Sequence, residues 1–219
     1  FSLQDLFNTA KVFSHCPIPN GNRVAIVTNS GGPGIMATDA VCEHGMEIAH
    51  LSDQTKEALR SFLPAAASVK NPVDMIASAP LEHYKKTLET VLADDGVDMV
   101  VVIYLPFLGL KDIDVAKAVM EIRAAHPDKP IVGVFMTKNE FFAHLSETEV
   151  NVPFFMFAEQ AVEGLARLNQ QRLWRERTDT PAPRYSVDTE TVEAVFKQAA
   201  ADNRVQPTTG AALQVLAAY

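Results

Sequence analysis

One stretch decides the fold of this chain: residues 23–34, which read Arg23-Val24-Ala25-Ile26-Val27-Thr28-Asn29-Ser30-Gly31-Gly32-Pro33-Gly34. Its first half is a continuous apolar run without the alternation of polar residues that a half-exposed strand shows. It therefore predicts a strand covered on both faces, as in a parallel sheet. Its second half consists of small and turn-forming residues, and residues 35–44 fit a helix that Gly45 ends. We expect a buried strand, a tight turn and a helix.

The same order of strand and helix repeats about five times along the chain. Further strands are predicted at residues 46–51, 99–105, 131–136 and 152–157, and they alternate with helices at 53–62, about 80–93, 112–126, 139–145 and 158–177. Such alternation specifies an open parallel sheet with helices on both faces. The predicted fold class is α/β, a flavodoxin-like doubly wound parallel sheet with extra flanking helices. Residues 64–75 are expected to be irregular.

The two ends of the chain indicate additional material. Residues 1–19 contain one amphipathic helix and a linker, which we interpret as the terminal helix of a preceding domain. Residues 20–178 form the α/β domain, and residues 179–219 form a proline-containing linker and two helices with too little apolar surface to fold alone. Because the chain starts at Phe1 and stops after an apolar stretch, we expect it to be part of a longer protein.

Composition excludes several classes of function. Hydrophobic residues make up 47% and charged residues 21% of the 219 residues, as in an ordinary globular protein. No apolar run approaches the roughly 18 residues of a membrane span. The formal net charge of −8 argues against a nucleic-acid partner. Cys16 and Cys42 cannot form a disulfide framework, so we expect a cytoplasmic setting. The six histidines have no metal-ligating spacing, and no metal site is predicted.

Three loops follow strands at the carboxyl edge of the predicted sheet, where open α/β sheets bind ligands. The first can hold an anion, because small residues let an anion approach the backbone and the following helix offers free N–H groups. A tight structural turn explains this loop about equally well, and the absence of a P-loop lysine argues against a nucleoside triphosphate. The predicted phosphate-binding residues are Asn29, Ser30, Gly31, Gly32, Pro33, Gly34 and Ile35.

The other two loops carry weaker indications. Asn71 and Asp74 offer an amide and a carboxylate, although an Asx turn made rigid by Pro72 is the plainer interpretation. The loop with Phe107, Leu108 and Gly109 is mostly apolar. An apolar loop tip suggests contact with another domain or an acyl group, and its alternative is simple packing under a neighbouring loop.

Two motifs resemble one enzyme family. The first is residues 21–39, and the second is the spaced series Leu59-Arg60, Phe62-Leu63-Pro64, Ala67-Ser68, Asn71-Pro72-Val73-Asp74. Together they are similar to the NDP-forming acyl-CoA synthetases, the ADP-forming acetyl-CoA synthetase group of the succinyl-CoA synthetase superfamily. The resemblance covers nearly the whole chain. It implies interconversion of acyl-CoA, ADP and phosphate with an acid, CoA and ATP, through an acyl phosphate and a phosphohistidine.

The resemblance also implies roles for parts of this chain. Residues 31–35 would begin a helix that faces the phosphohistidine, and the loops with Asn71, Asp74, Phe107, Leu108 and Gly109 would border the acyl or acid site. No catalytic residue is expected in this chain, because the phosphohistidine would precede Phe1. CoA, ATP or ADP, and Mg would belong to the full-length enzyme, and this chain alone would bind none tightly and have no synthetase activity.

The implied partners are an acyl-CoA or carboxylic acid, phosphate, and the CoA-binding, phosphohistidine and ATP-grasp domains of the same protein or a partner subunit. Residues 179–219 would lead into the ATP-grasp region, and a homo-oligomer is compatible with this organisation. Two other hypotheses remain open. One is a regulatory, acyl-CoA-sensing region of a protein lysine acetyltransferase. The other is a flavodoxin-like electron carrier, which would need aromatic loops that residues 29–34 lack.

Overall fold

The computed structural model describes residues 2–107, 109–146, 149–178 and 186–219. The chain divides into two compact units, one ending at Arg177 and one spanning Thr178–Tyr219. Each unit is described by itself. Among the described residues, no helix is both long and apolar enough to cross a membrane.

The first unit is built on a parallel sheet, which confirms the predicted fold class. Its strands are β1 (Arg23–Thr28), β2 (Glu47–Ile48), β3 (Val73–Asp74), β4 (Met99–Tyr104), β5 (Ile131–Phe135) and β6 (Phe154–Phe155). They are ordered β2-β1-β4-β5-β6, and the short β3 also pairs with β1. All of these pairs are parallel. This order is that of a doubly wound sheet.

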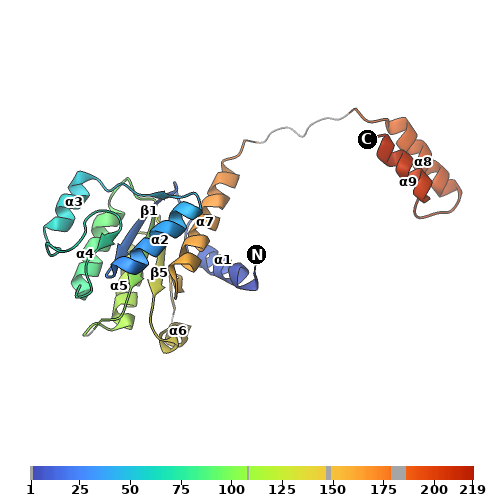
Figure 1. Cartoon of the computed structure of the whole chain (residues 1–219). Helices are drawn as coiled ribbons and strands as arrows, with labels where there is room; N and C mark the ends of the chain where they lie inside the picture. The colour runs from blue at the N-terminus through green and yellow to red at the C-terminus, as the bar shows by residue number, and fades with distance from the viewer. Residues whose placement is uncertain (1, 108, 147–148, 179–185) are drawn as a thin grey trace. The chain divides into compact units, whose positions relative to one another are not determined.

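Helices cover both faces of this sheet (Figure 1). One face carries α1 (Leu3–His15), α2 (Gly31–Glu43) and α7 (Ala158–Arg175); the other carries α3 (Asp53–Arg60), α4 (Leu81–Leu92), α5 (Asp112–Ala125) and α6 (Asn139–Ser146). Successive strand residues point to opposite faces. Val24 and Ile26 therefore enter one core, and Ala25 and Val27 enter the other. This double burial is why β1 lacks polar alternation.

The structure corrects several predicted boundaries. The second strand is only two residues long, and β3 lies in a segment predicted to be irregular. Helix α2 begins at Gly31, four residues before the start predicted from its composition. Proline is tolerated in a first helical turn because N–H groups there have no helical partner, so Pro33 fits this position. Gly31, Gly32 and Gly34, which the sequence pattern predicted to form a turn, thus belong to the first turn of a helix.

Helix α1 packs within the first unit. Ser2 and Asp5 form the capping box that starts it. Val12 is fully buried, and a side chain built on Gly164 of α7 would collide with it, so the two helices lie in close contact. That α1 ends a preceding domain, as we predicted, stays a prediction.

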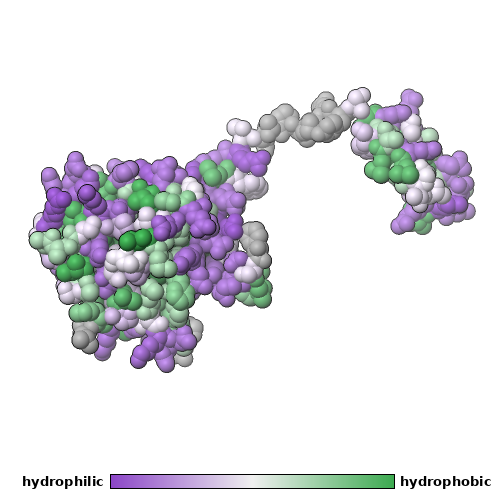
Figure 2. Space-filling model, viewed as in Figure 1, coloured by the Kyte–Doolittle hydropathy of each residue, from purple (hydrophilic) through white to green (hydrophobic). Residues whose placement is uncertain are grey.

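The second unit contains α8 (Thr189–Ala201) and α9 (Thr209–Ala217), close to their predicted bounds. The Asp188 N–H donates to the Ala218 carbonyl and joins the ends of the pair. Neither helix has a buried residue. Apolar side chains are visible on this unit in Figure 2; the large exposed ones include Phe196, Leu213, Leu216 and Tyr219. The linker predicted at residues 178–183 lies, from residue 179 onward, outside the described residues.

Candidate functional site: the carboxyl edge between β1 and β4

The sheet reverses its order at β1. The chain passes from β1 to β2 on one side and later returns to place β4 on the other. In open α/β sheets the crevice beyond the carboxyl ends of the strands at such a reversal is the usual ligand site. Here α2 begins just beyond β1, and the segment from Leu105 follows β4 directly. Two of the three predicted loops therefore flank this position.

Asn29 joins these two loops. Its side-chain amide donates to the carbonyl of Leu105 at 2.8 Å and accepts from the N–H of Leu105 at 2.9 Å. The residue is only 3% exposed. Its amide thus replaces a pair of ladder hydrogen bonds between the ends of β1 and β4. This contact fixes the loops, and it uses the Asn29 side chain within the protein.

The start of α2 is open. Thr28 Oγ1 donates to the carbonyl of Ser30 and accepts from its N–H, at 2.8 and 2.9 Å, and so orients the residue before the helix. The side chain of Ser30 forms no capping hydrogen bond, and Pro33 has no N–H. A Cβ on Gly32 would meet nothing within 4 Å. Uncapped N–H groups and the positive end of the helix dipole make this an anion-binding geometry.

The second predicted loop brings Asp74 to the same place. Asp74 is in register with Thr28 across the β1–β3 pair. Its Oδ1 accepts from the N–H of Ile76 at 2.9 Å, and its Oδ2 lies 3.2 Å from the position that a Cβ on Gly31 would take. A carboxylate therefore stands beside the start of α2. A phosphoryl group bound at the start of α2 would therefore lie either away from the Asp74 carboxylate or in direct contact with it.

The side chain of Asn71 hydrogen-bonds to the sheet and does not face a ligand at the start of α2. Its Oδ1 accepts from the N–H of Ile26 at 2.9 Å, and its Nδ2 donates to the carbonyls of Val24 and Ala49 at 2.8 and 3.0 Å. The side chain fills the gap along β1 between β2 and β3. Each polar atom of the amide is engaged, so Asn71 shapes the loop that carries Asp74 and offers no free N–H to a ligand. The peptide bond between Asn71 and Pro72 is cis.

A hydrogen bond from the end of β4 holds the third loop. The hydroxyl of Tyr104 donates to the carbonyl of Leu110 at 2.7 Å and closes the loop over the end of β4. Phe107 is 47% exposed. Gly109 has φ +94°, a conformation that side chains rarely adopt. Leu108 lies outside the described residues.

Sequence reasoning missed the full extent of the apolar surface at this edge. Ile35 and Met36 in α2 are 63% and 46% exposed, and Phe157, immediately before α7, is 46% exposed. Phe157 comes just after β6, and Ile35 and Met36 lie in the first turns of the helix that follows β1. Such side chains suit contact with another domain or with an apolar ligand.

Tyr84 of α4 was also missed. It is fully buried, and its hydroxyl has no hydrogen-bond partner among the described residues. Burial, together with the neighbouring Tyr104 and the charge of Asp74, raises the pKa of Tyr84. The hydroxyl therefore stays protonated. In the described part of the chain, no group of three or more His, Cys, Asp or Glu could hold a metal ion.

Fold and site together define a doubly wound α/β domain with an open helix start at its switch point. The Ligase-CoA domain family matches residues 24–165. The chain belongs to this family.

Several relatives agree with this assignment. The alpha subunit of ADP-forming acetate–CoA ligase II from Pyrococcus furiosus is 40% identical over 138 residues, which cover 62% of this chain and 30% of that protein. The ADP-forming 4-hydroxybutyrate–CoA ligase from Nitrosopumilus maritimus is 25% identical over all of this chain and 31% of that protein. This chain thus spans about a third of their length.

Solved structures share the fold. The crystal structure of PH0766 from Pyrococcus horikoshii matches with a TM-score of 0.72 and 36% identity, over 78% of this chain and 40% of that one. The dinucleotide-forming acetyl-coenzyme A synthetase 1 of Ca. Korarchaeum cryptofilum, in complex with phosphate and ADP, matches with a TM-score of 0.71 over 81% of this chain and 40% of that one. At 23% identity, the second shows the fold alone.

Proposed function

We propose that this chain is the part of an ADP-forming acyl-CoA synthetase that receives a phosphoryl group at the start of α2. The whole enzyme would interconvert acyl-CoA, ADP and phosphate with a carboxylic acid, CoA and ATP. An acyl phosphate would form first, and its phosphoryl group would pass to a histidine and then to ADP. The ADP-forming ligases described above support this reaction class.

One observation carries the proposal: an uncapped helix start at the switch point, inside the matched family region. The N–H groups of Gly31 and Gly32 and the helix dipole stabilise negative charge on a phosphoryl group while it is transferred. Asp74 beside Gly31 would disfavour a free phosphate dianion there by like-charge repulsion. A phosphoryl group whose charge is partly neutralised by its carrier fits this arrangement better.

The acyl or acid site would lie next to this helix start. Asp74, Phe107 and Gly109, together with Leu108, would border it, and Asn71 would hold the loop in place. The exposed apolar side chains at this edge favour an acid of low polarity or the apolar surface of a neighbouring domain.

The remaining chemistry would come from other parts of the enzyme. Residues 29–34 contain no lysine to bind triphosphate, and the described residues hold no carboxylate cluster for Mg. CoA, ATP or ADP, Mg and the reactive histidine would thus be supplied by CoA-binding, ATP-grasp and phosphohistidine domains. These domains would belong to the same protein or to a partner subunit, in the cytoplasm.

The test uses three substitutions of Gly32, where a side chain has room. In the assembled enzyme, Gly32→Asp should abolish phosphohistidine formation, because it places a negative charge where the phosphoryl group binds. In Gly32→Asn the side chain is nearly as large as aspartate but uncharged, and in Gly32→Ala it is a single methyl group. Both should keep more activity than the aspartate variant. Radiolabelled phosphate retained on the protein is the measurement.

Stability separates this effect from misfolding. An acidic residue in a first helical turn is stabilising by about 0.3–1 kcal/mol. The like charge of Asp74 offsets part of this gain, so Gly32→Asp should unfold at a denaturant concentration close to that of Gly32→Asn while it loses phosphorylation. Normal phosphohistidine formation in the aspartate variant would refute the placement of the phosphoryl group.

A further inference from the structure

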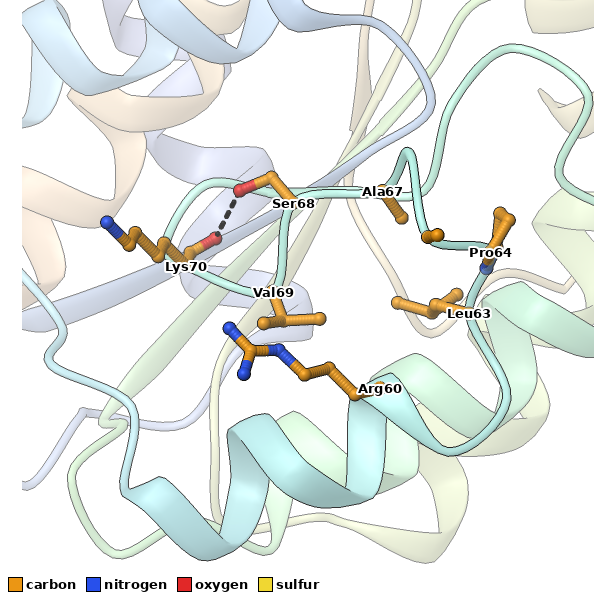
Figure 3. Close-up of a pocket in the computed structure, with 8 residues that line it drawn as sticks. Arg60, Leu63, Pro64, Ala67, Ser68, Val69 and Lys70 are labelled. Atoms are coloured by element: carbon orange, nitrogen blue, oxygen red, sulfur yellow. Dashed lines mark hydrogen bonds between the residues drawn. The ribbon is translucent and has the colours of Figure 1, made fainter.

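A groove on another part of the first unit is lined by the second sequence motif (Figure 3). It has a volume of about 620 Å³ and lies between the end of α3 and the following segment. Its lining residues are Arg60, Leu63, Pro64, Ala65, Ala67, Ser68, Val69 and Lys70. None of residues 28–35 contributes to it. The groove is therefore separate from the start of α2.

The charged residues that line this groove, Arg60 and Lys70, are both cationic. A smaller groove of about 310 Å³ shares Arg60 and Lys70 with it and adds Lys56. No Asp or Glu lines either groove, although the chain carries a net charge of −8. Lys56 pairs with Asp53 at 3.0 Å. In the described part of the chain neither Arg60 nor Lys70 forms an ion pair or hydrogen bond through its side chain. Both side chains are exposed and therefore accessible to a ligand.

The segment that presents Lys70 is preorganised. The N–H of Ser68 donates to the carbonyl of Asp74 at 2.9 Å, and the N–H of Asp74 donates to the carbonyl of Ser68 at 3.1 Å. The hydroxyl of Ser68 also donates to the carbonyl of Pro72 at 3.2 Å. Asn71 anchors the same loop in the sheet. A ligand that meets Lys70 would therefore order little backbone on binding, which favours affinity.

The groove also has an apolar lining. Leu63 and Val69 are buried residues that border it, and Pro64 and Ala67 lie beside them. In Figure 3 the Arg60 side chain extends from α3 toward Val69. An arginine fork matches phosphate oxygens, and a lysine adds a mobile point charge. Volumes of about 300–1,000 Å³ are typical of small-molecule sites. The lining therefore places two cationic side chains beside apolar ones.

We propose that the groove formed by Arg60, Lys70, Leu63 and Val69 binds an organic phosphate of nucleotide size. The phosphate contacts Arg60 and Lys70, and the organic body lies on the apolar side chains. This site goes beyond the proposed function, which assigns a phosphoryl group only to α2.

The experiment is an NMR titration of the 219-residue chain with ADP at low ionic strength, followed through backbone amides. The amides of Val69 and Lys70 should shift and report this groove, while those of Gly31 and Gly32 report the start of α2. The two sites thus give separate readouts, and either proposal can fail without the other. Inorganic phosphate should bind the groove more weakly than ADP, because it has no organic body. Added salt should weaken the binding of both ADP and inorganic phosphate, since interactions between exposed charges are screened beyond about 10 Å at 0.1 M.

Matched variants test the cations. Arg60→Gln and Lys70→Gln should each weaken ADP binding at the groove by about fivefold or more, as loss of a charge-assisted contact predicts. Lys117→Gln is the control: Lys117 is exposed and lines a different pocket with Glu121 and Glu149. It should leave the affinity unchanged. Equal weakening by all three variants, or no shift at Val69 and Lys70, would overturn the proposal. Polyglutamate that competes as well as ADP would overturn the assignment to an organic phosphate.

Discussion

Single amide side chains complete this sheet. Asn29 supplies hydrogen bonds between the ends of β1 and β4 where the backbone ladder stops. Asn71 does the same along the other edge of β1, between the two-residue strands β2 and β3. An asparagine can do this because it carries a donor and an acceptor in the same plane, like a peptide group. Both residues were predicted to bind ligands, and their amides are used within the fold.

Removing the Asn71 amide should therefore cost stability. Asn71→Ala removes the hydrogen bonds that this side chain makes with the N–H of Ile26 and the carbonyls of Val24 and Ala49. We expect a loss of about 2–4 kcal/mol in the free energy of unfolding. Urea unfolding measures it. Asn151→Ala is the control, because the exposed Asn151 makes one hydrogen bond, to the carbonyl of Met120. It should cost well under 1 kcal/mol. Similar losses in both variants would contradict the structural role of Asn71.

At the scale of elements, close packing depends on small residues. Helix α1 approaches α7 at Gly164, where an added Cβ would lie 2.5 Å from Cγ2 of Val12. Residues Leu3, Leu6 and Phe7 on the outer side of α1 remain exposed. The attachment of α1 to the first unit thus relies strongly on the buried Val12.

Gly164→Ala should loosen α1 without unfolding the sheet. The methyl group has no room unless Val12 moves, and overpacking of this kind costs about 1–3 kcal/mol. Amide hydrogen exchange should become faster in α1 while β1 and β4 keep their protection. Adding Val12→Ala makes space for the methyl group and should restore part of the coupling between the helices. Gly210→Ala, where an added Cβ meets nothing within 4 Å, should leave exchange in α1 unchanged. Unchanged protection of α1 in Gly164→Ala would contradict this contact.

For the whole molecule, buried carboxylates at the amino end of the sheet link stability to pH. Asp98 is 6% exposed and accepts hydrogen bonds from Nε and Nη2 of Arg23 at 2.7 and 2.8 Å, and from its N–H at 3.0 Å. Burial alone would raise the pKa of Asp98, but these bonds outweigh it and hold the pKa below its usual value of 3.8. The pKa of Asp94 is lowered in the same way, against burial, by Thr55, Ser52 and Gly96.

Stability should therefore fall in acid. A depressed carboxylate pKa contributes stability that is fully present above the unfolded value and is lost as pH falls below about 3.8. Asp98→Asn should destabilise the protein by about 1–2 kcal/mol at pH 7, and the difference from wild type should shrink as pH falls through this window. Urea midpoints at several pH values measure it. An equal difference at pH 7 and at pH 2.5 would contradict the assignment.

Long, strongly patterned segments were predicted well from sequence. Strands β1, β4 and β5 and helices α1, α5 and α7 lie within a few residues of their expected bounds, because their apolar residues repeat with a helical period or run continuously. The strand β3 was missed, since Val73 and Asp74 pair with β1 over only two residues. Composition misplaced the start of α2 because glycine and proline favour loops in isolation, whereas the family resemblance gave a helix start at residues 31–35. In the sheet, β1 and β4 position this segment and override that preference.

The sequence alone determined the fold class and the order of elements, because these depend on local pattern. That residues 29–35 bind an anion stays a prediction. Only the tertiary structure decided which side chains are free. It engaged Asn29 and Asn71 inside the fold and placed Asp74 beside Gly31. Hydrogen bonds and proximity between residues more than forty positions apart depend on how strands pair, and strand pairing is set by the packing of the whole sheet.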